Sequence, residues 1–420
     1  MGEEELRAAM VSRLVACARI RSDAVEQAFR AVPRHLFLPG LKPAQAYRDH
    51  AVATKWLDGE AISSASQPSM MAIMLEQLDL RPGHRVLEIG TGTGYNAALI
   101  AEMVGPTGSV VSIDIDRDLV EGAGRNLAAA GVLGVVLHTG DGALGYPAGA
   151  PYDRIVLTVG SWDIQPAWWS QLVPGGRLLL PLSVGGSQLS VALDLMAGRQ
   201  AYLLASSVRC CAFVRLRGQG AVSEAGLPLG PDGIALQPAR GTDVDVASVG
   251  RLFAERGRDW SSSVRLSGVD LWDGFGLWLA VQEPTTCRLL VDQAASRRWP
   301  SLLPAGTEGG TLLLAEPDGL AIVIPGATPN GQRSDEADDA SPVVVRGYGP
   351  VGALLAGRLL ALLEQWVDLG RPIASELRLR AYPAGAQLPA EPGIEINKRH
   401  SKLRLDWPRN PIADRPILER

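Results

Sequence analysis

Three glycines at alternate positions follow a short apolar segment early in the chain. The stretch reads Val86-Leu87-Glu88-Ile89-Gly90-Thr91-Gly92-Thr93-Gly94-Tyr95. A second apolar run, Val110 to Ile113, leads directly to Asp114. Glycine lets the backbone approach a ligand closely because no Cβ obstructs it, and a carboxylate one strand later can bind both hydroxyls of a ribose. The order predicts a nucleoside-binding βαβ unit, although many glycine-rich strand-to-helix turns bind nothing.

The spacing of these glycines bears on which nucleoside fits. It is G-x-G-x-G rather than the G-x-G-x-x-G pattern in which a helix N-terminus holds a pyrophosphate. A cofactor that carries an adenosine but no phosphates fits this turn better, and S-adenosylmethionine is the common one. A dinucleotide oxidoreductase is disfavoured on the same ground.

Length and composition exclude several classes of protein. The 420 residues exceed one ordinary domain, and 46% hydrophobic with 20% charged residues indicates well-formed cores. A net charge of −5 gives no excess of positive charge of the kind that binds nucleic acid or an anionic membrane. No apolar run reaches the roughly 20 residues of a membrane-spanning helix. The acidic N-terminus is unlike a signal peptide, and the cysteines lack the spacing of disulfide frameworks or zinc sites. We therefore expect a cytoplasmic protein without a metal centre.

Strand and helix patterns alternate regularly between Arg85 and Leu182. Buried strands that alternate with helices predict a parallel sheet covered on both faces, and such sheets bind ligands beyond the carboxyl ends of their strands. The glycine turn, Asp114 and the pair Asp141-Gly142 all follow strands at that edge. The expected strands are 85–89, 109–113, 135–139, 153–158 and 177–182, and the expected helices are 95–104, 116–130 and 167–172. The runs 189–195 and 201–214 predict an antiparallel closing hairpin.

The pattern changes near residue 220. Residues 221–235 are rich in Gly, Pro and small residues and are predicted to form a linker. Residues 236–420 combine strand-like runs with one amphipathic helix, Val351 to Leu369, and predict an α+β accessory domain. A basic cluster that includes Lys398 and Arg404 is most simply a solvated face. We therefore expect a catalytic domain over 1–220 and an accessory domain over 236–420.

Further motifs recur in a fixed order around the glycine turn. They are Val32-Pro33-Arg34-His35, Ser64-Ala65-Ser66-Gln67-Pro68, Gly140-Asp141-Gly142, Ala150-Pro151-Tyr152-Asp153 and Leu172-Val173-Pro174-Gly175-Gly176. This succession closely resembles the protein-L-isoaspartate O-methyltransferases over about residues 1–220. The resemblance implies a class I S-adenosylmethionine-dependent methyltransferase fold, a Rossmann-like doubly wound α/β sheet. It also implies methylation of the free carboxylate of an isoaspartyl residue in a peptide.

The resemblance assigns roles to individual residues. Asp114 is expected to bind the ribose hydroxyls, Asp141 to face the adenine amino group, and Ser66 to lie beside the transferred methyl, with Ser64 and Asp49 nearby. The full set expected to bind the cofactor is Glu88, Gly90, Thr91, Gly92, Gly94, Tyr95, Asp114, Asp141 and Gly142. The residues themselves leave alternatives open. Ser66 is equally suited to cap a helix that starts at Pro68, and Asp49 to cap a turn.

The chemistry makes modest demands on side chains. A free carboxyl, with a pKa of about 4, is already ionised at pH 7, so a carboxylate acceptor needs no strong general base. The site must align oxygen, methyl carbon and sulfur and exclude water, and such positioning contributes roughly 7–11 kcal/mol. A hydroxyl such as that of Ser66 can orient a carboxylate oxygen without competing as a nucleophile.

Two departures from the family pattern concern the substrate. Residues 50–65 differ from the usual family segment, and a long C-terminal portion is added. That portion resembles, more loosely, the methyltransferases that accompany ribosomally made lanthipeptides and graspetides, on Leu271-Trp272-Asp273-Gly274-Phe275, Gly347-Tyr348-Gly349 and Gly370-Arg371-Pro372. In that group an ordinary aspartate is esterified, and the ester closes to an aspartimide that can hydrolyse to isoaspartate. We expect this peptide-modifying activity. General repair of isoaspartyl damage is the alternative, and a non-catalytic peptide-binding module is a third possibility.

Overall fold

The computed structural model describes residues 2–198, 201–222, 226–229, 233–239, 244–253, 255–298, 309–324 and 340–408. The chain divides into two compact units. Unit 1 comprises Met1–Ser183, Gln188–Val222 and Leu379–Leu405. Unit 2 comprises Val184–Ser187, Ser223–Arg378 and Asp406–Arg420.

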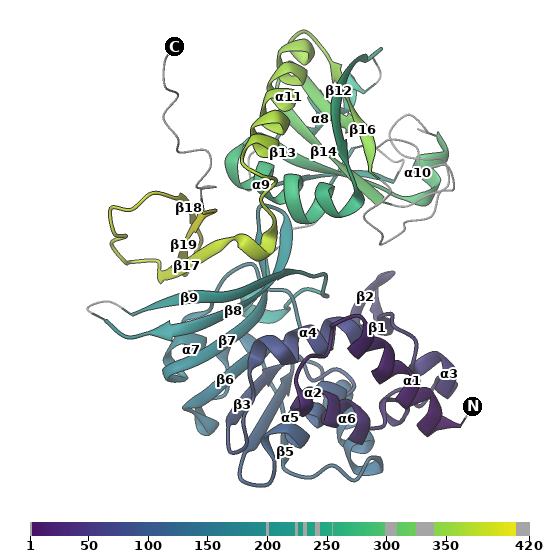
Figure 1. Ribbon diagram of the computed structural model, residues 1–420, viewed down its shortest axis with the longest axis vertical. Helices are drawn as coiled ribbons and strands as arrows, with labels where there is room; N and C mark the ends of the chain where they lie inside the picture. Colours follow the sequence, from purple (N-terminus) through teal and green to yellow (C-terminus); the bar gives the residue numbers. More distant parts are fainter. Residues whose placement is uncertain are drawn as a thin grey trace. The chain divides into compact units, whose positions relative to one another are not determined.

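A ten-stranded sheet in the order β18-β19-β17-β9-β8-β7-β6-β3-β4-β5 forms the centre of unit 1 (Figure 1). Five strands pair in parallel: β3 (Arg85–Ile89), β4 (Ser109–Asp114), β5 (Val135–Thr139), β6 (Tyr152–Leu157) and β7 (Leu172–Val184). β8 (Ser187–Met196) and β9 (Tyr202–Cys210) pair antiparallel, as the closing hairpin was predicted to do. The predicted doubly wound α/β sheet is therefore confirmed.

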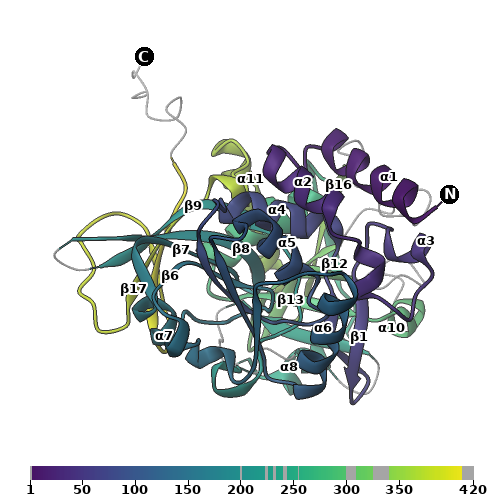
Figure 2. The same ribbon diagram turned by 90° about the horizontal axis from the view of Figure 1, so that it is seen from below.

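Helices bury the sheet of unit 1 in an extensive apolar core. The helices of this unit are α1 (Glu3–Ala16), α2 (Asp23–Ala31), α3 (Pro43–Ala46), α4 (Pro68–Leu78), α5 (Tyr95–Val104), α6 (Arg117–Ala129) and α7 (Pro166–Ser170). Met10 of α1, Phe29 of α2, Leu75 of α4 and Leu99 of α5 share one buried cluster with strand residues. Figure 2 shows α2, α4 and α5 gathered over one side of the strands.

A hairpin that the sequence analysis did not predict occupies residues 52–65. β1 (Val52–Leu57) and β2 (Glu60–Ala65) pair antiparallel as a separate two-stranded sheet. The turn between them is Asp58-Gly59, with φ values of +50° and +83°. Positive φ at both central residues is the geometry that a two-residue hairpin loop favours. The segment that departs from the family pattern is therefore a strand pair, with Trp56 62% exposed near its tip.

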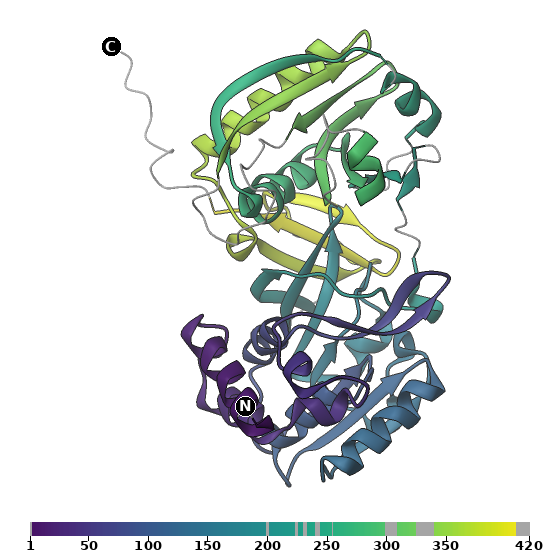
Figure 3. The same ribbon diagram turned by 90° about the vertical axis from the view of Figure 1, so that its right-hand side faces the viewer.

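The C-terminal part of the chain returns to the sheet of unit 1. β17 (Arg378–Pro383) pairs antiparallel with β9, and β18 (Ile394–Asn397) and β19 (Ser401–Asp406) extend the sheet beyond it. Figure 3 shows these yellow strands continuing the teal strands of unit 1. The predicted accessory domain over 236–420 is corrected accordingly, because main-chain pairing with β9 places 379–405 in unit 1. Lys398 and Arg404, predicted to be solvated, are 9% and 5% exposed.

Unit 2 is an α+β unit built on a seven-stranded sheet in the order β10-β11-β13-β14-β15-β16-β12. Its strands are β10 (Leu227–Pro228), β11 (Ile234–Pro238), β12 (Arg258–Leu266), β13 (Thr286–Val291), β14 (Gly309–Glu316), β15 (Gly319–Ile324) and β16 (Ser341–Tyr348). α9 (Phe275–Gln282) and α11 (Gly352–Asp368) contribute to one core, and α8 (Val246–Leu252) and α10 (Gln293–Arg298) to another. The predicted linker over 221–235 is wrong in part, since β10 and the start of β11 lie within it and pair with the sheet.

None of the helices in the described part of the chain has the length and apolar character needed to cross a bilayer.

Candidate active site

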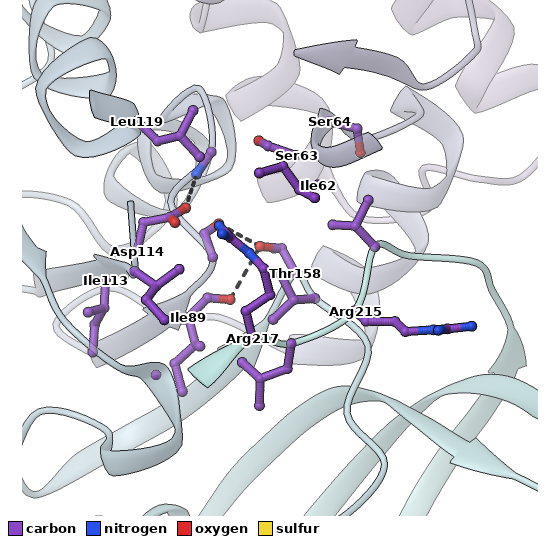
Figure 4. A pocket seen from close by; sticks show the side chains of 17 residues that line it. Ile62, Ser63, Ser64, Ile89, Ile113, Asp114, Leu119, Thr158, Arg215 and Arg217 are labelled. Atoms are coloured by element: carbon purple, nitrogen blue, oxygen red, sulfur yellow. Dashed lines mark hydrogen bonds between the residues drawn. The ribbon is translucent and has the colours of Figure 1, made fainter. Parts of the chain in front are cut away.

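A pocket lies at the carboxyl edge of the central strands of unit 1 (Figure 4). Gly90 and Gly92 follow β3, Asp114 ends β4, and Thr158 follows β6. Residues 62–64 of β2 and residues 214–217 after β9 complete its walls. The apolar side chains in these walls are Ile62, Ile89, Ile113, Ile115, Leu119, Val159, Val214 and Leu216. The position is the one at which open α/β sheets bind their ligands.

The glycine turn adopts a backbone that other residues disfavour. Gly90, Gly92 and Gly94 have φ values of +103°, +50° and +86°. A Cβ on Gly90 would lie 2.5 Å from Thr158 Oγ1, and that hydroxyl donates a hydrogen bond of 2.6 Å to the Gly90 carbonyl. A Cβ on Gly94 would lie 3.1 Å from Ala123 of α6, so Gly94 serves helix packing and does not line the pocket. Gly90 and Gly92 shape the pocket itself.

Asp114 is the carboxylate in this pocket. Its two oxygens accept hydrogen bonds from the main-chain N–H of Gly92 at 3.0 Å and of Asp116 at 3.2 Å. Burial raises the pKa of Asp114, and these two donors offset part of that shift. A carboxylate has about four lone-pair sites, so both oxygens keep capacity to accept bonds from a ligand.

These features fit the nucleoside cofactor expected from the sequence. The apolar walls suit the flat faces of an adenine, and the half-buried carboxylate of Asp114 suits the two hydroxyls of a ribose. Gly142 also lines the pocket, where a Cβ would lie 2.3 Å from Ile89 Cγ2. The residues that line the pocket therefore fit S-adenosylmethionine, and Gly90, Gly92, Asp114 and Gly142 are the ones that would hold it.

Glu88 and Thr91 do not line this pocket, so their expected part in cofactor binding stays a prediction. Glu88 is fully buried in β3, where it accepts hydrogen bonds from Ser112 Oγ at 2.5 Å and Asn96 Nδ2 at 2.8 Å. Thr91 Oγ1 lies 2.7 Å from the same Ser112 hydroxyl. Burial raises the pKa of Glu88 to about 7, although both hydrogen bonds act in the opposite direction. The side chains of Glu88, Thr91, Asn96 and Ser112 thus satisfy one another beneath the turn.

The buried Glu88 leads to a prediction about pH. Its pKa rises from 4.5 in the unfolded chain to about 7 in the folded protein. Because the folded state holds this proton more tightly, the free energy of unfolding falls as pH rises from about 4.5 to about 7, and then levels. Glu88→Gln should remove that slope and stabilise the protein at pH 8 by roughly 3 kcal/mol.

Urea unfolding at pH 5 and pH 8 checks this prediction. The exposed Glu102→Gln on α5 serves as the matched control and should keep the wild-type slope. An unchanged slope in Glu88→Gln would contradict the assignment.

Tyr95 does not line the pocket either, and its expected contact with the cofactor also stays a prediction. It begins α5, and its ring is 2% exposed between Phe29 and Phe37, at centroid distances of 6.3 and 5.4 Å. The guanidinium of the buried Arg34 lies 5.0 Å from the ring centroid. These contacts place the Tyr95 side chain in the core of unit 1.

Residues 211–219, which we call the strap, cross the carboxyl edge of the sheet after β9. Gln188 Oε1 accepts a bond from Phe213 N, and Gly160 pairs with Val214 and Leu216. Asp141 was expected to face an adenine. In the structure its carboxylate accepts hydrogen bonds from Gln219 N at 2.7 Å and Ala143 N at 2.9 Å and does not line the pocket, so that role stays a prediction. Asp141 thus anchors the far end of the strap.

A charged cluster joins the strap to the β1–β2 hairpin. Arg217 and Lys55 both pair with Asp116, at 2.6 and 2.9 Å, and Lys55 also pairs with Asp118 at 2.6 Å. Burial raises the pKa of Asp116, but the hydrogen bonds from Arg217 and Lys55 outweigh it and lower that pKa overall. Arg217 therefore lines the pocket, while its ion-pair partner Asp116 does not.

The three residues expected beside the methyl group are separated in the structure. Ser64 lines the cofactor pocket, and Ser66 lines a second, smaller pocket that shares Thr158 with the first. Ser66 is not the N-cap of α4, because that position is Gln67. Asp49 lines neither pocket. Its carboxylate accepts from Ser69 N at 2.8 Å and so caps the first turn of α4, which is close to the alternative considered for it.

The sequence analysis missed several residues of the site. Thr158 lies between the two pockets, Phe213 lines the smaller one, and Arg215 and Arg217 line the larger one. Thr158 was detectable, since it is the last residue of a predicted strand at the edge where ligands bind. The strap residues carry no such signal, because residues 211–214 fall at the end of a predicted strand and Arg215 and Arg217 follow it without a recognisable motif.

Comparison with known proteins agrees with this geometry. The protein-L-isoaspartate(D-aspartate) O-methyltransferase family matches residues 5–220. The protein-L-isoaspartate O-methyltransferase of Hyperthermus butylicus is 39% identical over 223 residues, which cover 51% of this chain and 90% of that protein. The namesake from Thermotoga maritima is 42% identical over 163 residues, which cover 39% of this chain. That match spans about half, 51%, of the length of the Thermotoga protein.

Two solved structures of the same description also match the chain. A protein-L-isoaspartate O-methyltransferase has a TM-score of 0.48 and 26% identity, covering 89% of this chain and 96% of that chain. A putative protein-L-isoaspartate O-methyltransferase from Plasmodium falciparum, in complex with S-adenosyl-L-homocysteine, has a TM-score of 0.44 and 17% identity, covering 50% of this chain. On the match over residues 5–220, the chain belongs to the protein-L-isoaspartate(D-aspartate) O-methyltransferase family of S-adenosylmethionine-dependent carboxyl methyltransferases.

Proposed function

We propose that this protein methylates the free carboxylate of isoaspartyl residues in peptides and proteins, the activity of a general repair enzyme. The family match over residues 5–220 carries the proposal. It favours the activity that the sequence analysis held as the alternative over the modification of a dedicated ribosomal peptide. The pocket around Asp114, Gly90 and Gly92 supports the same reaction class.

Each part of the site has a task in this reaction. S-adenosylmethionine, when bound, supplies a methyl group made electrophilic by a sulfonium. Asp114 would accept hydrogen bonds from the ribose hydroxyls, and the strap would exclude water from the pocket. Ser66 Oγ donates to the acceptor carboxylate, which is ionised already and needs no base. Arg34 steadies this segment, since its guanidinium donates to the Ser66 carbonyl at 2.9 Å.

Ser66→Ala tests the acceptor side of the site. A hydrogen bond to a charged group contributes about 1.5–3 kcal/mol, so kcat/KM for an isoaspartyl peptide should fall by roughly 10- to 150-fold. The affinity for S-adenosylhomocysteine should stay unchanged, because Ser66 lies outside the cofactor pocket. Ser69→Ala, three residues along the same segment, is the control and should leave both quantities unchanged. Equal loss in the two variants would count against a role for Ser66.

Mass spectrometry of matched peptides tests the substrate. Short peptides of unrelated sequence that carry isoaspartate should gain one methyl, and the same peptides with ordinary aspartate should not. Activity confined to ordinary aspartate would overturn the repair proposal.

A second candidate is esterification of an ordinary aspartate in a ribosomally made peptide. The Ser223–Arg378 part of unit 2 lies outside the family match and favours this candidate, as does the divergent hairpin over 52–65. The ester would close when the next amide nitrogen attacks its carbonyl, and the methoxy group would leave with the amide proton as methanol. A precursor peptide that gains a methyl and then loses methanol would support this candidate.

A further inference from the structure

The C-terminal return, residues 379–405, makes its most buried polar contact on Asp163. That carboxylate is 2% exposed. Its Oδ1 accepts from Ser401 Oγ at 2.6 Å and Ile164 N at 2.7 Å, and its Oδ2 accepts from His400 N at 2.6 Å. Burying a carboxylate is unfavourable unless hydrogen bonds replace its water, and two of these three donors come from the return. The return and the loop 158–165 are therefore joined at a specific point.

A second buried charge lies at the same joint. Lys398 Nζ donates to the carbonyl oxygens of Trp162 and Ser183, the latter at 2.6 Å. It also lies 5.0 Å from the centroid of the Trp162 ring. These contacts hold the main chain of the loop at Trp162, directly before Asp163, and join it to Ser183 near the end of β7.

The loop held by the return is also a wall of the cofactor pocket. Thr158 and Val159, at its start, line that pocket. Ser161 Oγ donates to the Asp163 carbonyl at 2.6 Å. Between them, Gly160 N donates to Val214 O and Gly160 O accepts from Leu216 N, each at 2.8 Å. Val214 and Leu216 belong to the strap and line the pocket too.

We propose that Asp163 is a positioning residue for methyl transfer and that Ser401 and His400 set its position. Through this carboxylate the C-terminal return fixes the loop 158–165. Because Gly160 of this loop is hydrogen-bonded to the strap, the return also fixes the strap, and loop and strap are two walls of the pocket. The inference rests on the proposed function only in taking this pocket as the cofactor site. Because residues 379–405 lie outside the family match, this control belongs to the extended chain.

Two serine variants of the full chain separate positioning from stability. Ser401→Ala removes one donor to Asp163, and Ser190→Ala removes the hydroxyl that donates to Gln77 Oε1 at 2.8 Å on the same sheet. Both serines are completely buried, so we expect similar losses of Tm. The Kd of S-adenosylhomocysteine, measured by calorimetry, should rise about 3- to 30-fold in Ser401→Ala and stay within about twofold in Ser190→Ala.

Equal Kd values in the two variants would overturn the proposal, whatever their Tm. If Ser401→Ala does not fold, Asp163→Asn provides the second comparison. It keeps the shape of the side chain but turns an amide N–H₂ toward donors, and it should raise the same Kd. Wild-type protein that binds the cofactor product but does not methylate isoaspartyl peptides would refute the proposed function alone. The binding comparison would remain valid.

Discussion

Asp114→Ala should lower the affinity for S-adenosylmethionine by at least about 100-fold, because two hydrogen bonds to a charged acceptor contribute about 1.5–3 kcal/mol each. The carboxylate is half-buried in the pocket and already oriented by Gly92 N and Asp116 N. Its removal leaves those two donors and the ribose hydroxyls without their acceptor. Equilibrium titration of the purified variant by calorimetry measures the effect directly.

Asp118→Ala is the matched control for this prediction. Asp118 lies four residues later, and its exposed side chain pairs with Lys55 outside the pocket. Its loss should change the affinity by less than about threefold, since exposed ion pairs contribute little. Comparable affinities in the two variants would remove the basis for the ribose assignment.

Gly90→Ala should both destabilise unit 1 and weaken cofactor binding. The new Cβ would sit 2.5 Å from Thr158 Oγ1, at a φ of +103° that alanine disfavours. Backbone strain and overpacking together cost about 2–5 kcal/mol, which corresponds to a fall in Tm of roughly 5–15 °C. Relief of the clash must move Thr158, which lines both pockets. Thermal unfolding with and without S-adenosylhomocysteine measures the two effects.

Gly105→Ala is the control that separates backbone strain from the contact between the new Cβ of Gly90→Ala and Thr158. Gly105 also has a positive φ, +65°, but a Cβ there would meet nothing within 4 Å. We expect the free energy of unfolding to fall by about 1 kcal/mol, which lowers Tm by a few degrees, and the cofactor affinity to stay unchanged. A similar loss of affinity in both variants would show that Thr158 is not the mediator.

The positions of Gly90, Gly92 and Asp114 could be predicted because they depend on local order. Each follows an apolar strand of a parallel sheet, and the topology brings the strand ends together. Glu88 and Asp49 show where such reasoning stops. The partners of Glu88 are Ser112 and Asn96 on other elements, and Asp49 caps a helix that begins well after it in the chain. Contacts of this kind leave no periodic signature in the sequence.

Two larger features differ in how far they could have been foreseen. The Asp58-Gly59 turn is a standard hairpin signal between two segments, so β1 and β2 were accessible to prediction. The pairing of β17 with β9 was not. It joins residues near 380 to residues near 204 across the whole of unit 2, and no local pattern specifies such a distant partner.

That distant pairing has a consequence for synthesis of the protein. A ribosome that has released residues 1–220 has delivered all of the family match, yet β17, β18 and β19 are still to come. Until they emerge, β9 is an open edge whose unpaired main-chain groups can recruit a wrong strand. The nascent methyltransferase must therefore wait for the inserted unit to be translated before its own sheet can close. A shortened chain that ends at residue 220 would keep that edge open for good.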